Sequence, residues 1–352
     1  MRKYLLIFIA ACFYYSGLVS LARWWKRKGS LDGQCLIILN YHCATGGDLH
    51  SHLLYLRRHY RLLHLEAALE ELYTPRKDES FKRAIRTPLV ITFDDGYRDN
   101  YSHGFALARE LHIPITIFLI PGYHESGEYF WWGEHKRLLR RTQVKEVTME
   151  GHTYHIDQPE ERHDLSKTID THLRYANSVA QRESFLESIR KELAIPASVD
   201  PEEEPTLPLT WAEVQEMEKS GLVSFGAHTQ NHPILAYLVD PTEVQYEVVE
   251  CRTQLEQHLG HPVRTFAYPV GQIQHIGEEV LQAVKQAGYK WALTTKYGFN
   301  TPRSEPYLLR RIEVDVSQHW LVMAAEAAGI WVLFSRLRWM PFIRKHFTNA
   351  TS

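Results

Sequence analysis

The sequence predicts an α/β fold built around a buried parallel sheet or barrel. Short apolar runs rich in β-branched residues recur along the chain, and a helix-like stretch follows most of them. The runs are continuously apolar instead of alternating, which is typical of strands buried on both faces. Several of them end in polar residues, which is typical of an active face at the carboxyl ends of parallel strands.

The predicted strands follow one another along the chain with amphipathic segments such as GEEVLQAVKQAG between them. They are CLIILNYH (35–42), PLVITFDDG (88–96), PITIFLIP (114–121), LVSFGAH (222–228), RTFAYP (264–269) and YKWALTT (289–295). The alternation breaks at about 127–207, which is polar and charged and ends in the linker DPEEEPTLP. We interpret this stretch as an insertion on the rim of the barrel, with its own helix in THLRYANSVAQRESFLESIRKELA.

An uncharged apolar run occupies residues 4–22, between Arg2-Lys3 and the segment RWWKRK. It is about long enough to span a bilayer, and the two tryptophans suit a membrane interface. A cleaved signal peptide is the alternative, because Ser20-Leu21-Ala22 resembles a cleavage site. The basic cluster disfavours export, so we interpret residues 1–28 as an uncleaved anchor or interfacial helix. The sequence predicts a membrane-associated protein and leaves the side of the membrane undetermined.

The carboxyl-terminal segment, 317–352, is apolar with Arg and Lys concentrated at its end. It suits either a packed terminal helix or a second helix that contacts a membrane. The composition of the 352-residue chain is globular, with 44% hydrophobic and 23% charged residues. A net charge of −2 provides no basic field for nucleic acid, and the four cysteines form neither a CxxC pair nor a dense disulfide framework.

Four of the predicted strands end in polar residues that could take part in catalysis or metal binding. His42, the pair Asp94-Asp95, His228 and Tyr268-Pro269 stand at these ends. Because the carboxyl ends of parallel strands share one face, we expect these residues to meet. In HTQNH (228–232), two histidines four residues apart can present both rings to one ion. Two imidazoles and one carboxylate make a three-ligand site with open positions, which is how catalytic zinc is held.

The ordered motifs TFDDG, HTQNH and FAYPVG resemble the polysaccharide deacetylase pattern (NodB homology, carbohydrate esterase family 4). The resemblance runs over about 35–316, and 127–207 matches least. It implies a distorted (β/α) barrel that carries a divalent metal, usually zinc. It also implies hydrolysis of N-acetyl groups on an N-acetylated glycan such as an exopolysaccharide.

The resemblance assigns roles to four residues. Asp94 matches the catalytic base and Asp95 the metal-ligating carboxylate, and His228 and His232 match the two metal-binding histidines. A metal would lower the pKa of water and polarise the acetyl carbonyl, while Asp94 takes the water proton.

The third motif departs from the commonest family pattern. Ala267 stands where many members have Arg, and Val270 where many have Tyr. The backbone N–H of Val270 can still serve as the oxyanion donor. To replace the missing Arg beside Asp94, we expect Arg311, or Arg310, of LLRRIEV.

A late Leu-x-His motif, the usual source of the general acid, is not convincing here. His42 in LNYH resembles the early acid histidine of a permuted subgroup of exopolysaccharide deacetylases, so we expect it to protonate the leaving amine. Trp131 and Trp132 in YFWWGE form either a sugar-stacking wall or part of a packed core. Tyr268 and Pro269 of the third motif are expected on the substrate side.

Three other functions compete with polysaccharide deacetylation. Deacylation of a lipid-linked sugar would suit the apolar termini equally well. A non-catalytic sugar-binding relative is disfavoured because the base, the ligands and His42 are all present. Phosphoryl transfer at an Asp pair would need phosphate-cradling glycines or a Lys nearby, and neither accompanies TFDDG.

Overall fold

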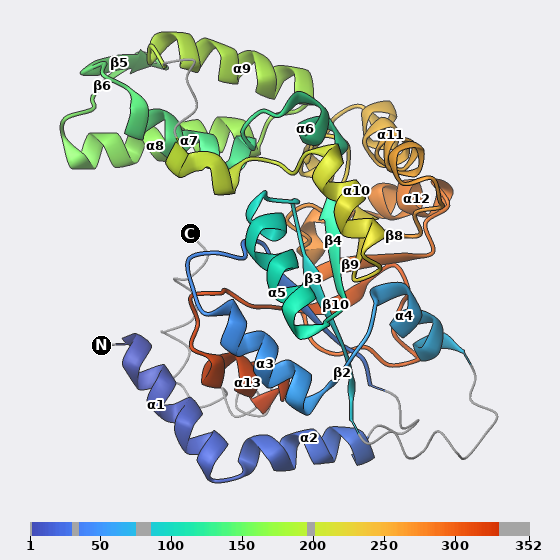
Figure 1. Ribbon diagram of the computed structural model, residues 1–352. Coiled ribbons are helices and arrows are strands. Elements are labelled where there is room, and N and C mark those ends of the chain that lie inside the picture. Colours follow the sequence, from blue (N-terminus) through green and yellow to red (C-terminus); the bar gives the residue numbers. More distant parts are fainter. Residues whose placement is uncertain (1, 30–34, 75–85, 196–200, 331–352) are drawn as a thin grey trace.

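A closed barrel of parallel strands forms the centre of the computed structural model, which describes residues 2–29, 35–74, 86–195 and 201–330 (Figure 1). Its strands are β1 (Ile37–Tyr41), β3 (Pro88–Phe93), β4 (Ile115–Leu119), β7 (Val223–Ala227), β8 (Thr265–Ala267), β9 (Trp291–Tyr297) and β10 (Leu309–Glu313). They pair in the order β1-β10-β9-β8-β7-β4-β3, and parallel pairing of β1 with β3 closes the ring. The (β/α) barrel predicted from the sequence is confirmed.

Helices surround the barrel, as the alternating pattern predicts. They are α3 (Leu49–His59), the π-helix η2 (Asn100–Phe105), α5 (Ala106–Leu111), α6 (Pro121–Ser126), α10 (Trp211–Lys219), α11 (Pro241–Leu259), α12 (Glu278–Gln286) and α13 (Trp320–Ala327). A short strand, β2 (Arg61–Leu62), pairs with the start of β3. Short 3₁₀ turns are η3 (Pro201–Thr206), η4 (Leu235–Tyr237) and η5 (Ile273–His275).

The barrel interior changes from apolar to polar along the strands. Near the amino ends, inward side chains form one cluster with α4 (Leu65–Tyr73), and its strand members include Ile38, Val90 and Leu309. Because strand side chains alternate between faces, the residues two positions further on point inward as well. These are Asn40, Thr92 and Arg311, which are at most 1% exposed. The polar layer lies toward the carboxyl ends of the strands.

Between α6 and η3 the chain forms a lobe beside the carboxyl end of the barrel (Figure 1). The lobe contains α7 (Trp131–Arg141), the antiparallel pair β5 (Glu146–Met149) and β6 (His152–His155), α8 (Pro159–Arg174) and α9 (Val179–Glu192). It has its own hydrophobic core, which includes Trp131, Leu138, Leu165, Ile169 and Leu186.

The amino-terminal apolar segment forms two helices, α1 (Arg2–Tyr15) and α2 (Leu18–Gly29), where the sequence predicts one. Gly17 separates them with φ +82°, a left-handed conformation that ends an α-helix. Among the described residues no single helix meets the length and hydropathy of a membrane span. The two helices, which meet at 67°, meet those criteria only when taken as a bent pair.

One face of α1 packs on α13 through Leu6, Ile7, Ala10 and Leu321. The opposite faces of α1 and α2 expose large apolar side chains: Tyr4, Leu5, Phe8, Tyr15, Leu18, Leu21, Trp24 and Trp25. The carboxyl-terminal segment 317–352 is described only as far as residue 330. Its α13 packs against α1 and α3, and residues 331–352 lie outside the described part of the chain.

Candidate active site

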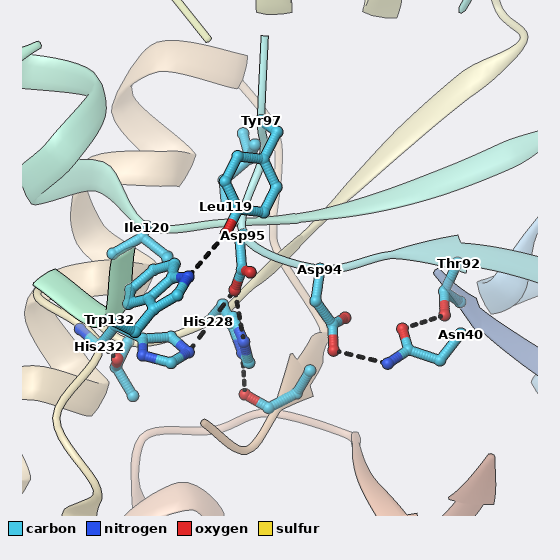
Figure 2. A network of polar contacts seen from close by, with 12 residues as sticks. Asn40, Thr92, Asp94, Asp95, Tyr97, Leu119, Ile120, Trp132, His228 and His232 are labelled. Carbon is cyan, nitrogen blue, oxygen red and sulfur yellow. Dashed lines mark hydrogen bonds and ion pairs between the residues drawn. The ribbon is translucent and has the colours of Figure 1, made fainter. Parts of the chain in front are cut away.

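The residues expected at the strand ends come from four loops at the carboxyl end of the barrel. Asp94 and Asp95 follow β3, the segment from His228 to His232 follows β7, Val270 follows β8 and His42 follows β1. Figure 2 shows Asp95, His228 and His232 pointing toward one another, while Asp94 points away toward Asn40. The two neighbouring carboxylates therefore have separate surroundings.

Asp95, His228 and His232 form a compact group of possible metal ligands. One ligand atom from each lies within 4.8 Å of the other two, and all three residues are buried. Asp95 Oδ1 is 3.4 Å from His228 Nε2 and 3.6 Å from His232 Nε2. Within the described residues, Asp95 Oδ1 has no hydrogen-bond partner. Buried polar atoms normally have partners, so the group suits a cation placed among its N, N and O atoms.

The backbone fixes the orientation of His228. Its Nδ1 lies 2.7 Å from the carbonyl oxygen of Ala267 and donates to it, so Nε2 is the nitrogen that faces Asp95 and is free to bind a metal. Burial lowers the pKa of His228, but the Asp95 and Asp94 carboxylates outweigh this and raise it above the usual value. Burial and the charge of His228 lower the pKa of His232 well below the usual value. His232 therefore stays neutral, as a metal ligand must be.

Asp94 is held by a separate buried network. Arg311 donates from Nη1 to Oδ1 at 2.7 Å and from Nη2 to Oδ2 at 2.8 Å, and Asn40 Nδ2 donates to Oδ2 at 3.0 Å. Burial alone would raise the pKa of Asp94, but Arg311, followed by His228, His42 and hydrogen bonding, lowers it to about 2. Asp94 is therefore ionised at neutral pH, with both oxygens fixed in place.

Arg311 occupies the position expected of a residue that orients Asp94. It is fully buried, and it also donates from Nε to the Thr294 carbonyl at 3.0 Å and from Nη1 to Asn40 Oδ1 at 2.9 Å. Arg310, the alternative, is exposed, because successive side chains of β10 point to opposite faces.

Asn40 and Thr92 complete this network and were not singled out from the sequence. Asn40 Oδ1 accepts from Thr92 Oγ1 at 3.2 Å, and Thr92 Oγ1 also lies 2.8 Å from the Leu39 carbonyl. The signal for Asn40 was a lone amide inside the apolar run CLIILNYH. Such a residue in a buried strand needs partners, and here they are Asp94 and Arg311.

The site loops hold unusual backbone conformations. Seven non-glycine residues of the described chain have positive φ, and four of them belong to these loops: Asp95 (74°), Thr229 (65°), His232 (55°) and Val270 (58°). A positive φ is rare for β-branched residues such as Val and Thr. Strain of this kind persists where surrounding contacts impose it, and it gathers at functional sites.

Contacts from α11 hold the loop that carries the histidines. Glu247 is fully buried, and its carboxylate accepts from the Asn231 backbone N–H and side-chain amide, each at 2.7 Å. The Glu247 carbonyl accepts from the backbone N–H of Gln230 at 3.0 Å. Glu247 was not recognised in the sequence, because one acid in a charged helix has no local signal.

His42 lies half-buried at the end of β1, and the loop that follows it is anchored. Asn100 Nδ2 donates to the His42 carbonyl at 2.9 Å. Asp99 accepts from the backbone N–H groups of Ala44 and Thr45 at 2.8 and 2.9 Å. A positive charge on His42 acts on both Asp94 and His232, so its ring belongs to the same electrostatic environment.

The two tryptophans of YFWWGE differ. Trp132 is half-buried, its ring centroid lies 4.2 Å from that of His232, and its Nε1 donates to Tyr97 Oη at 2.6 Å. Trp131 is 1% exposed, and its Nε1 donates to the His232 carbonyl at 2.9 Å. A sugar cannot stack on a side chain with so little exposed surface, so the substrate-contact prediction is wrong for Trp131.

The third motif needs a similar correction. Tyr268 is 1% exposed and donates from Oη to the Tyr307 carbonyl, and Pro269 is buried too, so neither side chain faces a substrate. Val270 is half-buried, and its N–H has no hydrogen-bond partner among the described residues.

Comparison with known proteins gives concordant matches. The family model described as polysaccharide deacetylase matches residues 82–292, more than half of the chain. YxkH of Bacillus subtilis, a protein named for the same family, is 22% identical over 302 residues, covering 84% of this chain and 76% of YxkH.

Two solved structures share the fold. The deacetylase PplD of Streptococcus pyogenes, solved with acetate, is 17% identical with a TM-score of 0.53, covering 83% of this chain and 98% of PplD. IcaB of Ammonifex degensii is 18% identical with a TM-score of 0.52, covering 84% of this chain and 98% of IcaB. At these identities the likeness establishes the fold.

Proposed function

This chain belongs to the polysaccharide deacetylase family and is a carbohydrate deacetylase, and we propose that it removes N-acetyl groups from an N-acetylated polysaccharide by metal-dependent hydrolysis. The separation of two neighbouring carboxylates carries this proposal. Asp95 faces two histidines, whereas Arg311 and Asn40 hold Asp94 away from them. One carboxylate is thereby placed to bind a cation and the other to accept a proton.

Asp95, His228 and His232 would hold the metal. Two neutral imidazoles and one carboxylate suit Zn²⁺, and three protein ligands leave positions open for water and substrate. A bound divalent ion would lower the pKa of water and polarise the acetyl carbonyl. The buried Asp95 Oδ1, which has no hydrogen-bond partner among the described residues, supports this assignment.

Asp94 is the general base in this proposal. Water attacks the acetyl carbonyl carbon, and the ionised Asp94 carboxylate accepts the proton that the water loses. With a pKa of about 2, Asp94 is a weak base, so its contribution is mainly its fixed position and its ionised state. Arg311 keeps the carboxylate oriented throughout.

Collapse of the tetrahedral oxyanion breaks the C–N bond and yields acetate and a free sugar amine. The unpaired N–H of Val270 would donate to the oxyanion. The amine leaves only when protonated, and His42 would supply that proton as the general acid. Trp132, half-buried beside His232, offers an aromatic face to the sugar.

A polymer fits the arrangement better than a lipid-linked sugar. We also propose that the chain associates with a membrane surface through the exposed apolar faces of α1 and α2. In Figure 1, α2 lies at the amino end of the barrel and α1 runs beside α3 and α13, both away from the lobe. A sugar carried on a lipid headgroup would therefore be held away from the catalytic loops, whereas a polymer need not be held at the membrane surface.

The function is tested by acetate release from soluble N-acetylglucosamine oligosaccharides of β-1,6 and β-1,4 linkage. We expect release by the wild type, loss of release on chelation, and recovery when Zn²⁺ is restored. His228→Ala should lose both bound metal and acetate release while its circular dichroism stays native. If His228→Ala retains stoichiometric metal by elemental analysis, His228 is not a ligand.

A further inference from the structure

A second polar site lies at the amino end of the barrel, away from the catalytic loops. A cavity of about 260 Å³ is lined by Ser20, Arg23, Trp24, Arg58, His59, Arg86 and Thr87. We call it the basic cavity. It lies between α2, the end of α3 and the residues before β3, and neither the proposed mechanism nor the family resemblance uses it.

The polar lining of the basic cavity consists of three arginines, two hydroxyl groups and the His59 imidazole. Burial, and then the charges of Arg23, Arg58 and Arg86, lower the pKa of His59 to about 4, so all three guanidinium groups act on one ring. No carboxylate of the described residues forms an ion pair with these arginines. Part of the lining is preorganised, because Arg23 donates to Ser20 Oγ at 3.1 Å and to Tyr55 Oη at 3.3 Å.

Convergent arginines without acidic partners are the chemistry that recognises phosphate. Guanidinium groups donate paired hydrogen bonds to phosphate oxygens, and hydroxyl groups such as Ser20 and Thr87 add further donors. The cavity is smaller than the roughly 300–1,000 Å³ of typical small-molecule sites, which suits a headgroup better than a whole oligosaccharide.

The surroundings of the cavity indicate where the phosphate comes from. Trp24 lines the cavity and belongs to the exposed apolar face of α2, together with Leu18, Leu21 and Trp25. An amphipathic helix with tryptophans on its apolar face lies in the membrane interface, at the depth of lipid phosphates. A basic pocket at the edge of such a face is placed to receive a headgroup.

We infer that the basic cavity binds the phosphate of an anionic phospholipid and thereby orients the barrel on the membrane. β3 runs between Thr87, which lines the cavity, and Asp94 in the active site, and a strand rises about 3.3 Å per residue. The two sites are therefore roughly 20 Å apart at opposite ends of the barrel. Docked in this way, the enzyme presents its catalytic loops away from the lipid.

The test is flotation of the full-length protein with vesicles of pure phosphatidylcholine or of equimolar phosphatidylcholine and phosphatidylglycerol. Arg58→Gln removes one exposed cation of the cavity, and Arg57→Gln, its neighbour on α3 outside the lining, is the matched control. We expect tighter binding to the anionic vesicles. Arg57→Gln should weaken it by no more than about fivefold, the effect of one arginine at a membrane surface, and Arg58→Gln should weaken it several times more, because it also loses hydrogen bonds to the phosphate.

Equal weakening by both variants would show unspecific charge attraction and overturn the inference, as would equal binding to the two vesicle types. Titration with inorganic phosphate forms the second arm. The wild type could bind inorganic phosphate, lose that binding in Arg58→Gln, and yet show no preference for anionic vesicles. That result would mean that the cavity binds free phosphate, and it would contradict the proposal of a lipid ligand. Acetate release from soluble oligosaccharides should be unchanged in both variants, which separates this test from that of the catalytic function.

Discussion

The two ends of the barrel use arginine in opposite ways. At the carboxyl end, Arg311 is fully buried and donates to both oxygens of Asp94. At the amino end, Arg58 and Arg86 are exposed, and no described carboxylate pairs with them. Arg311 has its charge satisfied inside the protein, whereas Arg58 and Arg86 have no carboxylate partner among the described residues.

The difference follows from the cost of removing charge from water. A buried guanidinium must be paired, and the pair is useful where a reacting group needs a fixed position. An exposed guanidinium stays solvated and can exchange water for an external anion. The buried pair of Arg311 and Asp94 therefore suits a catalytic role, and the arginines of the basic cavity, which have no acidic partner among the described residues, suit the binding of an external anion.

Breaking the internal pair should have the largest effect. Arg311→Met leaves Asp94 buried without its cation, which costs about 3–5 kcal/mol of unfolding free energy. Urea unfolding measures this loss, and Arg310→Met, the exposed neighbour, should stay within about 0.5 kcal/mol of the wild type. Adding Asp94→Asn to Arg311→Met removes the stranded charge and should recover part of the loss. No recovery would indicate that Arg311 acts by packing alone.

The same pair predicts a dependence of stability on pH. The folded pKa of Asp94, about 2, lies below the unfolded value, so its contribution is fully present above about pH 4 and is lost as pH falls toward 2. The contribution is on the order of 2 kcal/mol. Denaturation curves recorded at a series of pH values should show this loss in the wild type and not in Asp94→Asn. Identical pH profiles would contradict the depressed pKa.

His42→Ala sharpens the comparison within the catalytic end. The variant should bind metal normally and lose about a hundredfold in turnover, because the leaving amine is no longer protonated. The alkaline limb of its rate profile should flatten as well. Near wild-type turnover with an unchanged pH profile would leave His42 with a structural role only.

The smallest effect is expected at the amino end. Gly17 has φ +82° between α1 and α2, and alanine in that conformation costs about 1 kcal/mol. Gly17→Ala should lower thermal stability slightly and leave acetate release from soluble oligosaccharides unchanged. A large loss of that activity would mean that the two ends are coupled, contrary to the comparison.

The fold and the grouping of site residues could be predicted because parallel strands share one face. Continuous apolar runs identified the strands, and their polar ends identified Asp94, Asp95 and His228. The sequence could not decide between Arg310 and Arg311 until the inward register of β10 was known. Asn40 interrupts an apolar strand, and only its neighbours across the barrel explain it.

Adjacent residues with similar side chains were the main source of error. Trp131 and Trp132 point about 100° apart on one helix, so one ring is fully buried and the other stays half-buried beside His232, and the sequence does not say which. Tyr268 belongs to a recognisable motif, but its ring packs inward. The break between α1 and α2 at Gly17 also depends on local backbone conformation. The apolar composition of the segment alone predicted one helix.

The central claim is that Asp94 and Asp95 divide two tasks between them. Asp94→Asn and Asp95→Asn, measured side by side for bound metal by elemental analysis and for acetate release, test it most directly. Both variants should lose most of their turnover, and only Asp95→Asn should lose the metal, because Asp94 contacts Arg311 and Asn40 and not the histidines. Equal metal loss in the two variants, or full turnover in Asp94→Asn, would contradict the account.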